Sequence, residues 1–185
     1  EICNCCDISV VYYGIEVAKP TIEVKSNEQE FSPRIGTISR LVPQKDLETL
    51  LRAFVIVSAE FPKAELLIVG SGPLESSLRL LAKNLGIEKN LKWLGRTSDT
   101  ESFYRSLDTF VLTSLYEGFG LVLLEAMNLQ IPVVATNISA IPEVIGSNHP
   151  LISELSNPES FAKNIISSLS PLMNSKVVEF QRLRL

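Results

Sequence analysis

The stretch SLYEGFGLVLLEAM, residues 114–127, decides the fold of this chain. A largely apolar run, residues 107–113, precedes it and predicts a buried strand, and apolar residues at helical spacing follow it from Leu121. Between strand and helix stand Glu117 and two glycines, at the place where an α/β sheet presents the carboxyl ends of its strands to ligands. Glycines let backbone N–H groups at a helix start approach an anion closely. This junction therefore predicts a ligand-binding site.

Two carboxylates flank these glycines. Glu117 precedes the first helical turn, from which it can reach into the mouth of a crevice, and Glu125 follows about two turns later. A charge at Glu125 is costly unless it has a partner, because its sequence neighbours are apolar: Leu123, Leu124, Ala126 and Met127. The two adjacent hydroxyls of a ribose would satisfy such a carboxylate. The alternative is a loop acid followed by a solvated helix position.

Length and composition describe an ordinary globular protein. The 185 residues suffice for one sizeable core, and the hydrophobic fraction of 45% and charged fraction of 21% are typical. The net charge of −4 argues against non-specific nucleic-acid binding. No apolar run approaches the roughly 20 residues that span a bilayer, and the first residues lack the pattern of a secretory signal. Because the chain begins with Glu1 rather than Met, we expect a fragment.

The cysteines, Cys3, Cys5 and Cys6, lie within four residues of one another. A disulfide framework needs cysteines that are spread and even in number, so none is predicted. The sole histidine, His149, is distant in the sequence, which disfavours a zinc site. The pattern favours free thiols in a reducing, cytoplasmic compartment, with a metal or redox role as the alternative.

Strands and helices alternate along the rest of the chain. Predicted strands cover 34–39, 66–69, 91–94, 107–113 and 131–135, after a β-rich run at 8–13 and a polar linker at 20–31. Predicted helices begin after the N-cap Asp46, at Pro73, near Asp99, at Pro142, at Pro158 and near Ser175. This alternation predicts the α/β class, with a doubly wound parallel sheet and right-handed crossovers.

Two further loops carry chemistry. Arg40 and Lys45 follow the first domain strand, and a forked guanidinium with a point ammonium suits a diphosphate; the alternative is two solvated cations. The segment 70–72, Gly-Ser-Gly, follows the next strand, but Glu75 occupies the third glycine position of the dinucleotide fingerprint. That segment therefore favours a structural turn whose glycines permit close approach.

These segments together resemble the C-terminal, nucleotide-sugar-binding half of retaining glycosyltransferases with the GT-B fold, of the family 4 or group 1 type. The resemblance covers residues 9–168 and rests on five segments in the same order: a hinge at 11–16, a diphosphate loop of Ser39, Arg40 and Leu41 with Lys45, the E-x7-E pattern from Glu117 to Glu125, and the segments 131–136 and 141–143. It implies a Rossmann-like sheet that forms the C-terminal half of a GT-B fold.

The resemblance also implies roles for the diphosphate and sugar contacts. Ser39, Arg40 and Lys45 would hold the donor diphosphate, with the two cations neutralising its charge in place of a metal ion. The sequence contains no Asp-x-Asp pair that would bind such an ion. Glu117 would meet the donor sugar, and backbone amides would hold sugar and phosphate at Gly118, Phe119, Gly120 and Leu121.

The nucleoside contacts follow from the same resemblance. Glu125 would accept the ribose hydroxyls, and the turn of Gly95 and Arg96 would face the nucleobase largely through its backbone. The chain departs from the family at Asp46, where a glycine is frequent, and at residues 139–140, where Ser-Ala replaces a frequent Gly-Gly. Asp46 is expected to cap a helix, and the second departure bears on which sugar is bound.

The resemblance further implies a division of the chain. Residues 1–32 would be a remnant of an upstream half with the hinge, 33–170 the nucleotide-sugar-binding domain, and 171–185 a C-terminal helix that starts the crossover to the upstream half. The full protein would move a hexose or N-acetylhexosamine from a UDP- or GDP-sugar to a glycan or lipid-linked acceptor bound by that upstream half, in the cytoplasm at the periphery of the membrane. The isolated fragment would be inactive. Alternatives are a non-catalytic nucleotide-sugar-binding module and a nucleotide-sugar epimerase.

Overall fold

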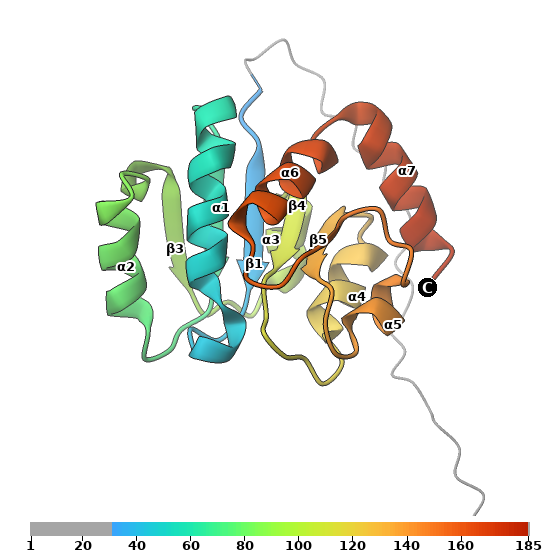
Figure 1. The fold of residues 1–185 in the computed structure, drawn as a ribbon, viewed down its shortest axis with the longest axis horizontal. Helices are drawn as coiled ribbons and strands as arrows, with labels where there is room; N and C mark the ends of the chain where they lie inside the picture. Colours follow the sequence, from blue (N-terminus) through green and yellow to red (C-terminus); the bar gives the residue numbers. More distant parts are fainter. Residues whose placement is uncertain (1–30, 185) are drawn as a thin grey trace, which may run out of the picture.

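Six parallel strands form a single sheet in the order β3-β2-β1-β4-β5-β6 (Figure 1). The computed structural model describes residues 31–184. The strands are β1 (Arg34–Ile38), β2 (Glu65–Val69), β3 (Leu91–Gly95), β4 (Thr109–Leu112), β5 (Val133–Thr136) and β6 (Ile152–Ser153). The strand order reverses between β1 and β4, which is the switch point where such sheets bind ligands. The doubly wound parallel sheet predicted from the sequence is confirmed.

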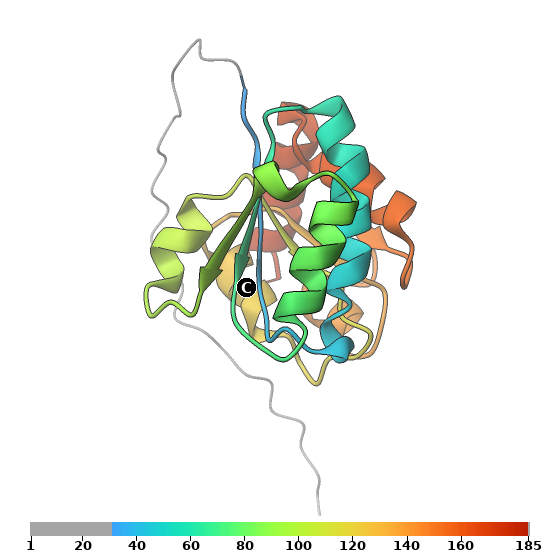
Figure 2. The same ribbon diagram turned by 90° about the vertical axis from the view of Figure 1, so that its left-hand side faces the viewer.

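Helices cover both faces of the sheet (Figure 2). They are α1 (Leu47–Glu60), α2 (Glu75–Asn84), α3 (Thr100–Arg105), α4 (Leu121–Asn128), α5 (Ile141–Ile145), α6 (Pro158–Ser168) and α7 (Pro171–Arg182), with 3-10 turns η1 (Pro43–Lys45) and η2 (Glu88–Asn90). One core cluster joins α1, α2, α6 and α7 to the sheet, and the other joins α3, α4 and α5 to its opposite face. Successive residues of β2 enter alternate clusters, which is why the central strands read as unbroken apolar runs.

The apolar stripe predicted after Asp46 lies in the core. All of its members are buried on α1: Leu47, Leu50, Leu51, Phe54 and Val57. Asp46 caps the helix as expected, because its carboxylate accepts hydrogen bonds from the Thr49 amide at 3.4 Å and the Thr49 hydroxyl at 2.8 Å. The predicted short helix near Asp99 is also confirmed as α3, with Asp99 accepting from the Ser102 amide.

Several predicted boundaries are wrong. Pro73 lies before α2 rather than in its first turn, since the chain first makes a turn in which the Glu75 N–H donates to the Gly72 carbonyl. The last helix begins at Pro171 rather than near Ser175, because the Ser170 hydroxyl caps it and a proline fits the first turn. Strand β4 is shorter than residues 107–113, since the Leu107 N–H still donates to the Tyr104 carbonyl at the end of α3.

The predictions for the N-terminal segment lie outside the described residues. These are the β-rich run at 8–13, the hinge at 11–16, most of the linker at 20–31 and the three cysteines. Within the part of the chain that the structure describes, no helix combines the length and apolar character needed to cross a bilayer.

Candidate functional site

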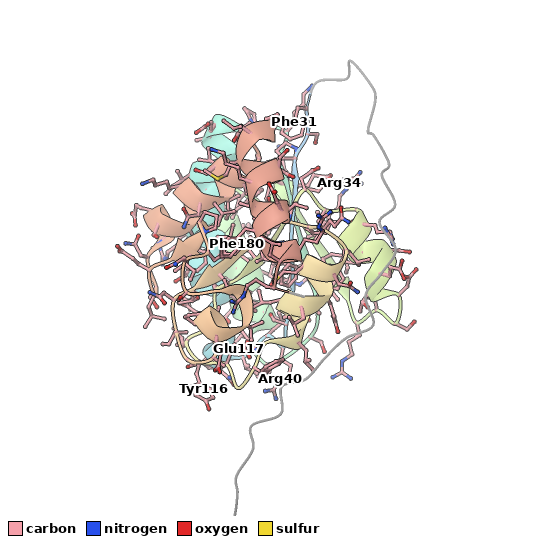
Figure 3. The ribbon with its side chains drawn as sticks, turned by 90° about the vertical axis from the view of Figure 1, so that its right-hand side faces the viewer. Phe31, Arg34, Arg40, Tyr116, Glu117 and Phe180 are labelled. Carbon is pink, nitrogen blue, oxygen red and sulfur yellow. The ribbon has the colours of Figure 1, made fainter. Side chains whose placement is uncertain are left out.

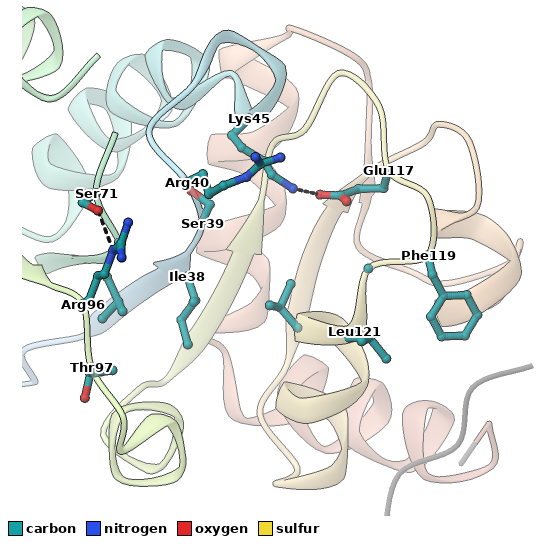
Figure 4. Close-up of a pocket in the computed structure, with 14 residues that line it drawn as sticks. Ile38, Ser39, Arg40, Lys45, Ser71, Arg96, Thr97, Glu117, Phe119 and Leu121 are labelled. Carbon is teal, nitrogen blue, oxygen red and sulfur yellow. Dashed lines mark hydrogen bonds and ion pairs between the residues drawn. The ribbon is translucent and has the colours of Figure 1, made fainter. Parts of the chain in front are cut away.

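A pocket of about 710 Å³ lies at the carboxyl ends of the strands, beside the switch point between β1 and β4 (Figure 4). Its wall comes from the ends of four strands and the segments that follow them: Ile38, Ser39, Arg40 and Lys45 at β1; Val69, Gly70 and Ser71 at β2; Arg96 and Thr97 at β3; and, after β4, Glu117, Phe119 and Gly120 with Leu121 and Val122 at the start of α4. Segments far apart in the sequence, from Ile38 to Val122, thus meet in one place.

Most of the predicted site residues line this pocket. They are Ser39, Arg40, Lys45, Arg96, Glu117, Phe119, Gly120 and Leu121. Gly95, Gly118 and Glu125 are not part of the wall. Sequence reasoning did not assign the wall residues Ile38, Val69, Gly70, Ser71, Thr97 and Val122 to the site. The position of the last residues of each strand at the ligand-binding edge is the signal that could have indicated them.

Three cationic side chains face the pocket. Arg40 is exposed at the mouth, while the Lys45 side chain is only 13% exposed. The Arg96 Nε donates a hydrogen bond of 2.9 Å to the Ser71 hydroxyl, which fixes its guanidinium at the end of β3. Figure 3 shows Arg40, Tyr116 and Glu117 at one end of the molecule, far from Arg34 at the start of β1. The pocket therefore combines fixed and adaptable positive charge.

Lys45 and Glu117 form an ion pair in the pocket wall (Figure 4). The Glu117 side chain is 10% exposed, and its Oε1 also accepts a hydrogen bond of 2.7 Å from the Ser114 hydroxyl. The alternative interpretations of Lys45 as a solvated cation and of Glu117 as a plain loop acid are therefore wrong. A buried charge pair of this kind is costly to desolvate and persists because each member satisfies the other.

The start of α4 presents backbone donors to the pocket. Gly120 is the N-cap, with φ of 87° in the left-handed region, and its carbonyl accepts from the Leu123 N–H. The N–H groups of Leu121 and Val122 belong to the first turn, where no preceding helical carbonyl can pair with them. Both residues line the pocket. An anion there would gain these donors and the positive end of the helix dipole.

One buried hydroxyl on the pocket wall lacks a partner. Among the residues that the structure describes, Ser39 Oγ is the single buried side-chain polar atom without a hydrogen bond. Buried polar groups normally find partners, so a bound ligand is a natural candidate for this one.

The Gly-Ser-Gly turn is structural, as the sequence favoured. A Cβ added at Gly70 would lie 1.8 Å from the Ser39 carbonyl oxygen, and one at Gly72 would lie 2.4 Å from that of Leu41. These glycines let the loops after β1 and β2 pack against each other, where the Leu41 N–H donates to the Ser71 carbonyl at 3.1 Å. This close approach places the lining residues Gly70 and Ser71 beside Ser39 in the pocket wall.

Glu125 has a partner that the sequence did not reveal. Its Oε2 accepts a hydrogen bond of 2.8 Å from the Tyr104 hydroxyl, and the same hydroxyl lies 3.2 Å from the Val122 carbonyl, to which it also donates. Tyr104 is only 1% exposed. Burial, with the hydrogen bond and charge of Glu125, raises the pKa of Tyr104 far above its usual value, so the phenol remains a donor. Glu125 lies one turn beyond the wall residue Val122 on the same face of α4.

The described residues suggest no metal site, because they contain no group of three or more His, Cys, Asp or Glu side chains arranged to hold an ion. The pocket wall instead combines cations, one carboxylate, amides and hydroxyls. Such a set suits a phosphorylated ligand that also bears hydroxyl groups.

Comparison with known proteins agrees with this chemistry. Residues 18–174 match the family of glycosyl transferases group 1, so the chain belongs to that family. The Corynebacterium glutamicum GDP-mannose-dependent monoacylated alpha-(1-6)-phosphatidylinositol monomannoside mannosyltransferase is 35% identical over 147 residues, 75% of this chain and 38% of that protein. The N-acetyl-alpha-D-glucosaminyl L-malate synthase of Bacillus anthracis is 38% identical over 108 residues, 58% of this chain and 28% of that protein.

Solved structures show the same fold. TarM of S. aureus, in a complex with Fondaparinux, alpha-GlcNAc-glycerol and UDP, superimposes with a TM-score of 0.80 at 23% identity, over 92% of this chain and 34% of TarM. The Rossmann-like fold of GT-B glycosyltransferases is therefore confirmed. The chain spans little more than a third of the length of the curated relatives that it matches.

Proposed function

We propose that this chain is the donor-binding half of a retaining glycosyltransferase of the family 4 type. The full protein transfers a hexose or N-acetylhexosamine from a nucleotide-diphosphate sugar to a glycan or lipid-linked acceptor, without a metal ion. The observation that carries the proposal is the pocket at the switch point, where Arg40, Lys45 and the start of α4 converge. Group 1 membership supports the same conclusion.

The wall residues suit the charge changes of glycosyl transfer. The bond between the anomeric carbon and the β-phosphate oxygen breaks, and the diphosphate leaves with the electron pair. The acceptor oxygen forms the new bond to the anomeric carbon and gives up its proton to an oxygen of the leaving diphosphate. Arg40, Lys45 and the first-turn amides of α4 would stabilise the charge that develops on the leaving oxygens. Positive groups already fixed in place do this without the help of a metal ion.

The E-x7-E pair takes two roles in this proposal. Glu117 contacts the donor sugar from the pocket wall. Glu125, one turn further along α4, accepts hydrogen bonds from the ribose hydroxyls, while its Oε2 accepts one from the Tyr104 hydroxyl. The turn of Gly95 and Arg96 faces the nucleobase. Gly95 already contributes its carbonyl to the Gly70 N–H, so we assign the contact with the base to the Arg96 backbone.

The rest of the protein supplies the acceptor. We place residues 1–32 with an upstream half that binds the acceptor, and α7 with the start of a helix that returns to it. The fragment alone binds donor and transfers little. The protein works in the cytoplasm, at the periphery of the membrane where a lipid-linked acceptor is presented.

The donor is a UDP- or GDP-sugar. The structurally similar TarM was solved with UDP, and the similar C. glutamicum mannosyltransferase is GDP-mannose-dependent. Calorimetric titration of this chain with UDP, GDP and ADP in EDTA would identify the base. We expect one nucleotide to bind, and Arg40→Ala to weaken it about tenfold, since a charge-assisted hydrogen bond contributes about 1.5–3 kcal/mol.

The matched control is Arg52→Ala, which removes an exposed cation on α1 away from the pocket and leaves the affinity unchanged. A well-folded chain that binds none of the three nucleotides would overturn the proposal. Binding that requires Mg²⁺ would overturn its metal independence. In the full-length protein, the anomeric configuration of the product, read by NMR, tests retention.

A further inference from the structure

The loops that carry Lys45 and Glu117 are clamped to each other. The Leu115 N–H donates to the Gln44 carbonyl at 2.8 Å, and the Gln44 side-chain amide donates to the Tyr116 carbonyl at 2.8 Å. The Thr113 hydroxyl donates to the Lys45 carbonyl at 2.9 Å. These bonds join the residues that precede Glu117 to Gln44 and Lys45, so the backbones that carry the ion pair are held together by the fold.

This ion pair reduces the positive charge that the pocket offers to an anion. Lys45 is the least exposed cation on the wall, where a charge acts through a lower dielectric than in water. Its ammonium is already neutralised by a carboxylate that bears the same sign of charge as a diphosphate. An arriving diphosphate must therefore share Lys45 with Glu117 and approach the negative carboxylate.

We propose that Glu117 lowers the affinity of the pocket for nucleoside diphosphates by holding Lys45. Glu117 thereby acts as a charge regulator that lets the diphosphate product leave. This inference rests on the proposed function and adds a property of the same site, namely that binding is weaker than the cations alone would allow. Lys45 has three N–H donors, so it can keep one on Glu117 while another reaches a phosphate oxygen.

The test compares dissociation constants for UDP, GDP and inorganic pyrophosphate between this chain and its Glu117→Gln variant. Glutamine has nearly the same shape and can still accept from Ser114, but it bears no charge. We expect Glu117→Gln to bind about tenfold more tightly, which corresponds to about 1.4 kcal/mol. Lys45→Ala should bind more weakly than the unmodified chain. In the Lys45→Ala background the gain from Glu117→Gln should fall below threefold, because no ammonium remains to be released.

Ser114→Ala is the matched control, since it removes the second hydrogen bond to Glu117 and keeps the charge. Its affinity should stay within twofold of the unmodified chain. If the Glu117→Gln variant is unfolded at the titration temperature, the Glu117→Ala variant, which removes the same charge, is used in its place.

The outcomes separate this inference from the function on which it rests. Clear binding by the unmodified chain with an equal or weaker affinity in Glu117→Gln would overturn the inference alone. A full tenfold gain that persists without Lys45 would overturn the part assigned to Lys45. Failure of the unmodified chain and of every variant to bind nucleotide would overturn both.

Discussion

Two single residues at positions where the family resemblance suggests glycine have left-handed backbone conformations. Asp46 has φ of 43° and Ser139 has φ of 51°, both in the left-handed region that glycine adopts most readily. Asp46 offsets its strain, because its carboxylate caps α1 and accepts a hydrogen bond of 2.8 Å from Ser156. Ser139 is exposed, and its side chain makes no hydrogen bond within residues 31–184. The strain at Ser139 is therefore uncompensated.

Ser139→Gly is expected to stabilise the chain by about 0.5–1 kcal/mol. The left-handed conformation costs a non-glycine residue roughly 1–2 kcal/mol, and the extra freedom of glycine in the unfolded chain offsets part of the gain. Urea denaturation measures the change. Ser156→Gly is the control, because Ser156 has φ of 49° but also donates to Asp46, so relief of strain and loss of a hydrogen bond should nearly cancel. Equal stabilisation by both substitutions would contradict this explanation.

For single residues, the sequence predicts side-chain contacts between residues close in the chain and misses contacts between residues far apart in it. The Asp46 cap follows from residues three positions apart, so the pattern alone indicates it. The charge of Glu125 clearly needed a partner, but Tyr104 comes from another helix, and no spacing in the sequence points to it. In the same way, nothing local shows that Lys45 and Glu117, 72 residues apart, form an ion pair.

Among the elements, the loops after β1 and β2 determine the shape of the pocket. They touch at Gly70, which has φ of 135° and lies against the Ser39 carbonyl. The Ser39 N–H also donates to the Val69 carbonyl at 3.0 Å, so the same contact holds both strand ends together. Gly118 differs, because a Cβ there would meet nothing within 4 Å.

Gly70→Ala is expected to cost more than about 3 kcal/mol and to weaken nucleotide binding at least tenfold, since the methyl group forces the strand ends apart and strains the backbone. Thermal denaturation and calorimetric titration measure the two effects. Gly118→Ala, made in the loop between β4 and α4, should change stability by less than about 1 kcal/mol. If Gly70→Ala kept full affinity for nucleotide, the loop contact would not shape the site.

Element identities followed from the sequence better than element ends did. Long apolar stripes such as that of α1 fix a helix by themselves, because burial dominates local preference. Strand β6 has only two residues, too few to show a periodicity. It exists because its neighbour β5 offers an edge to pair with. The start of α7 at Pro171 depends on a capping serine rather than on the apolar residues, so the pattern placed it late.

In the whole molecule, one buried polar network ties the last helix to the sheet. The Gln181 side chain on α7 accepts from the Val133 N–H at 3.0 Å and donates to the Ile131 carbonyl at 2.9 Å. His149 lies 3.3 Å from the Gln181 amide oxygen and accepts at Nδ1 from the Leu151 N–H, which places the proton on Nε2. Its ring also meets the Phe180 ring edge to face. A neutral histidine satisfies this site.

Folding stability should therefore fall as the pH drops below about 6.5. Burial lowers the pKa of His149 to about 4, despite the hydrogen bond to Gln181. Below pH 6.5 the histidine therefore takes up a proton in the unfolded chain while it stays neutral in the folded chain. Stability is complete above pH 6.5, and between pH 7.5 and 5 this single group should remove about 2 kcal/mol. Carboxylates lose their charge only at lower pH, since Lys92, by its hydrogen bond, and Arg34 lower the pKa of Glu65 below 4.5.

Urea denaturation of the unmodified chain and of His149→Gln between pH 7.5 and 5 isolates the contribution of the histidine. The variant should be less stable at pH 7.5 and should lose little more by pH 5. Parallel losses in both proteins would mean that protonation of His149 is not the cause of the pH dependence.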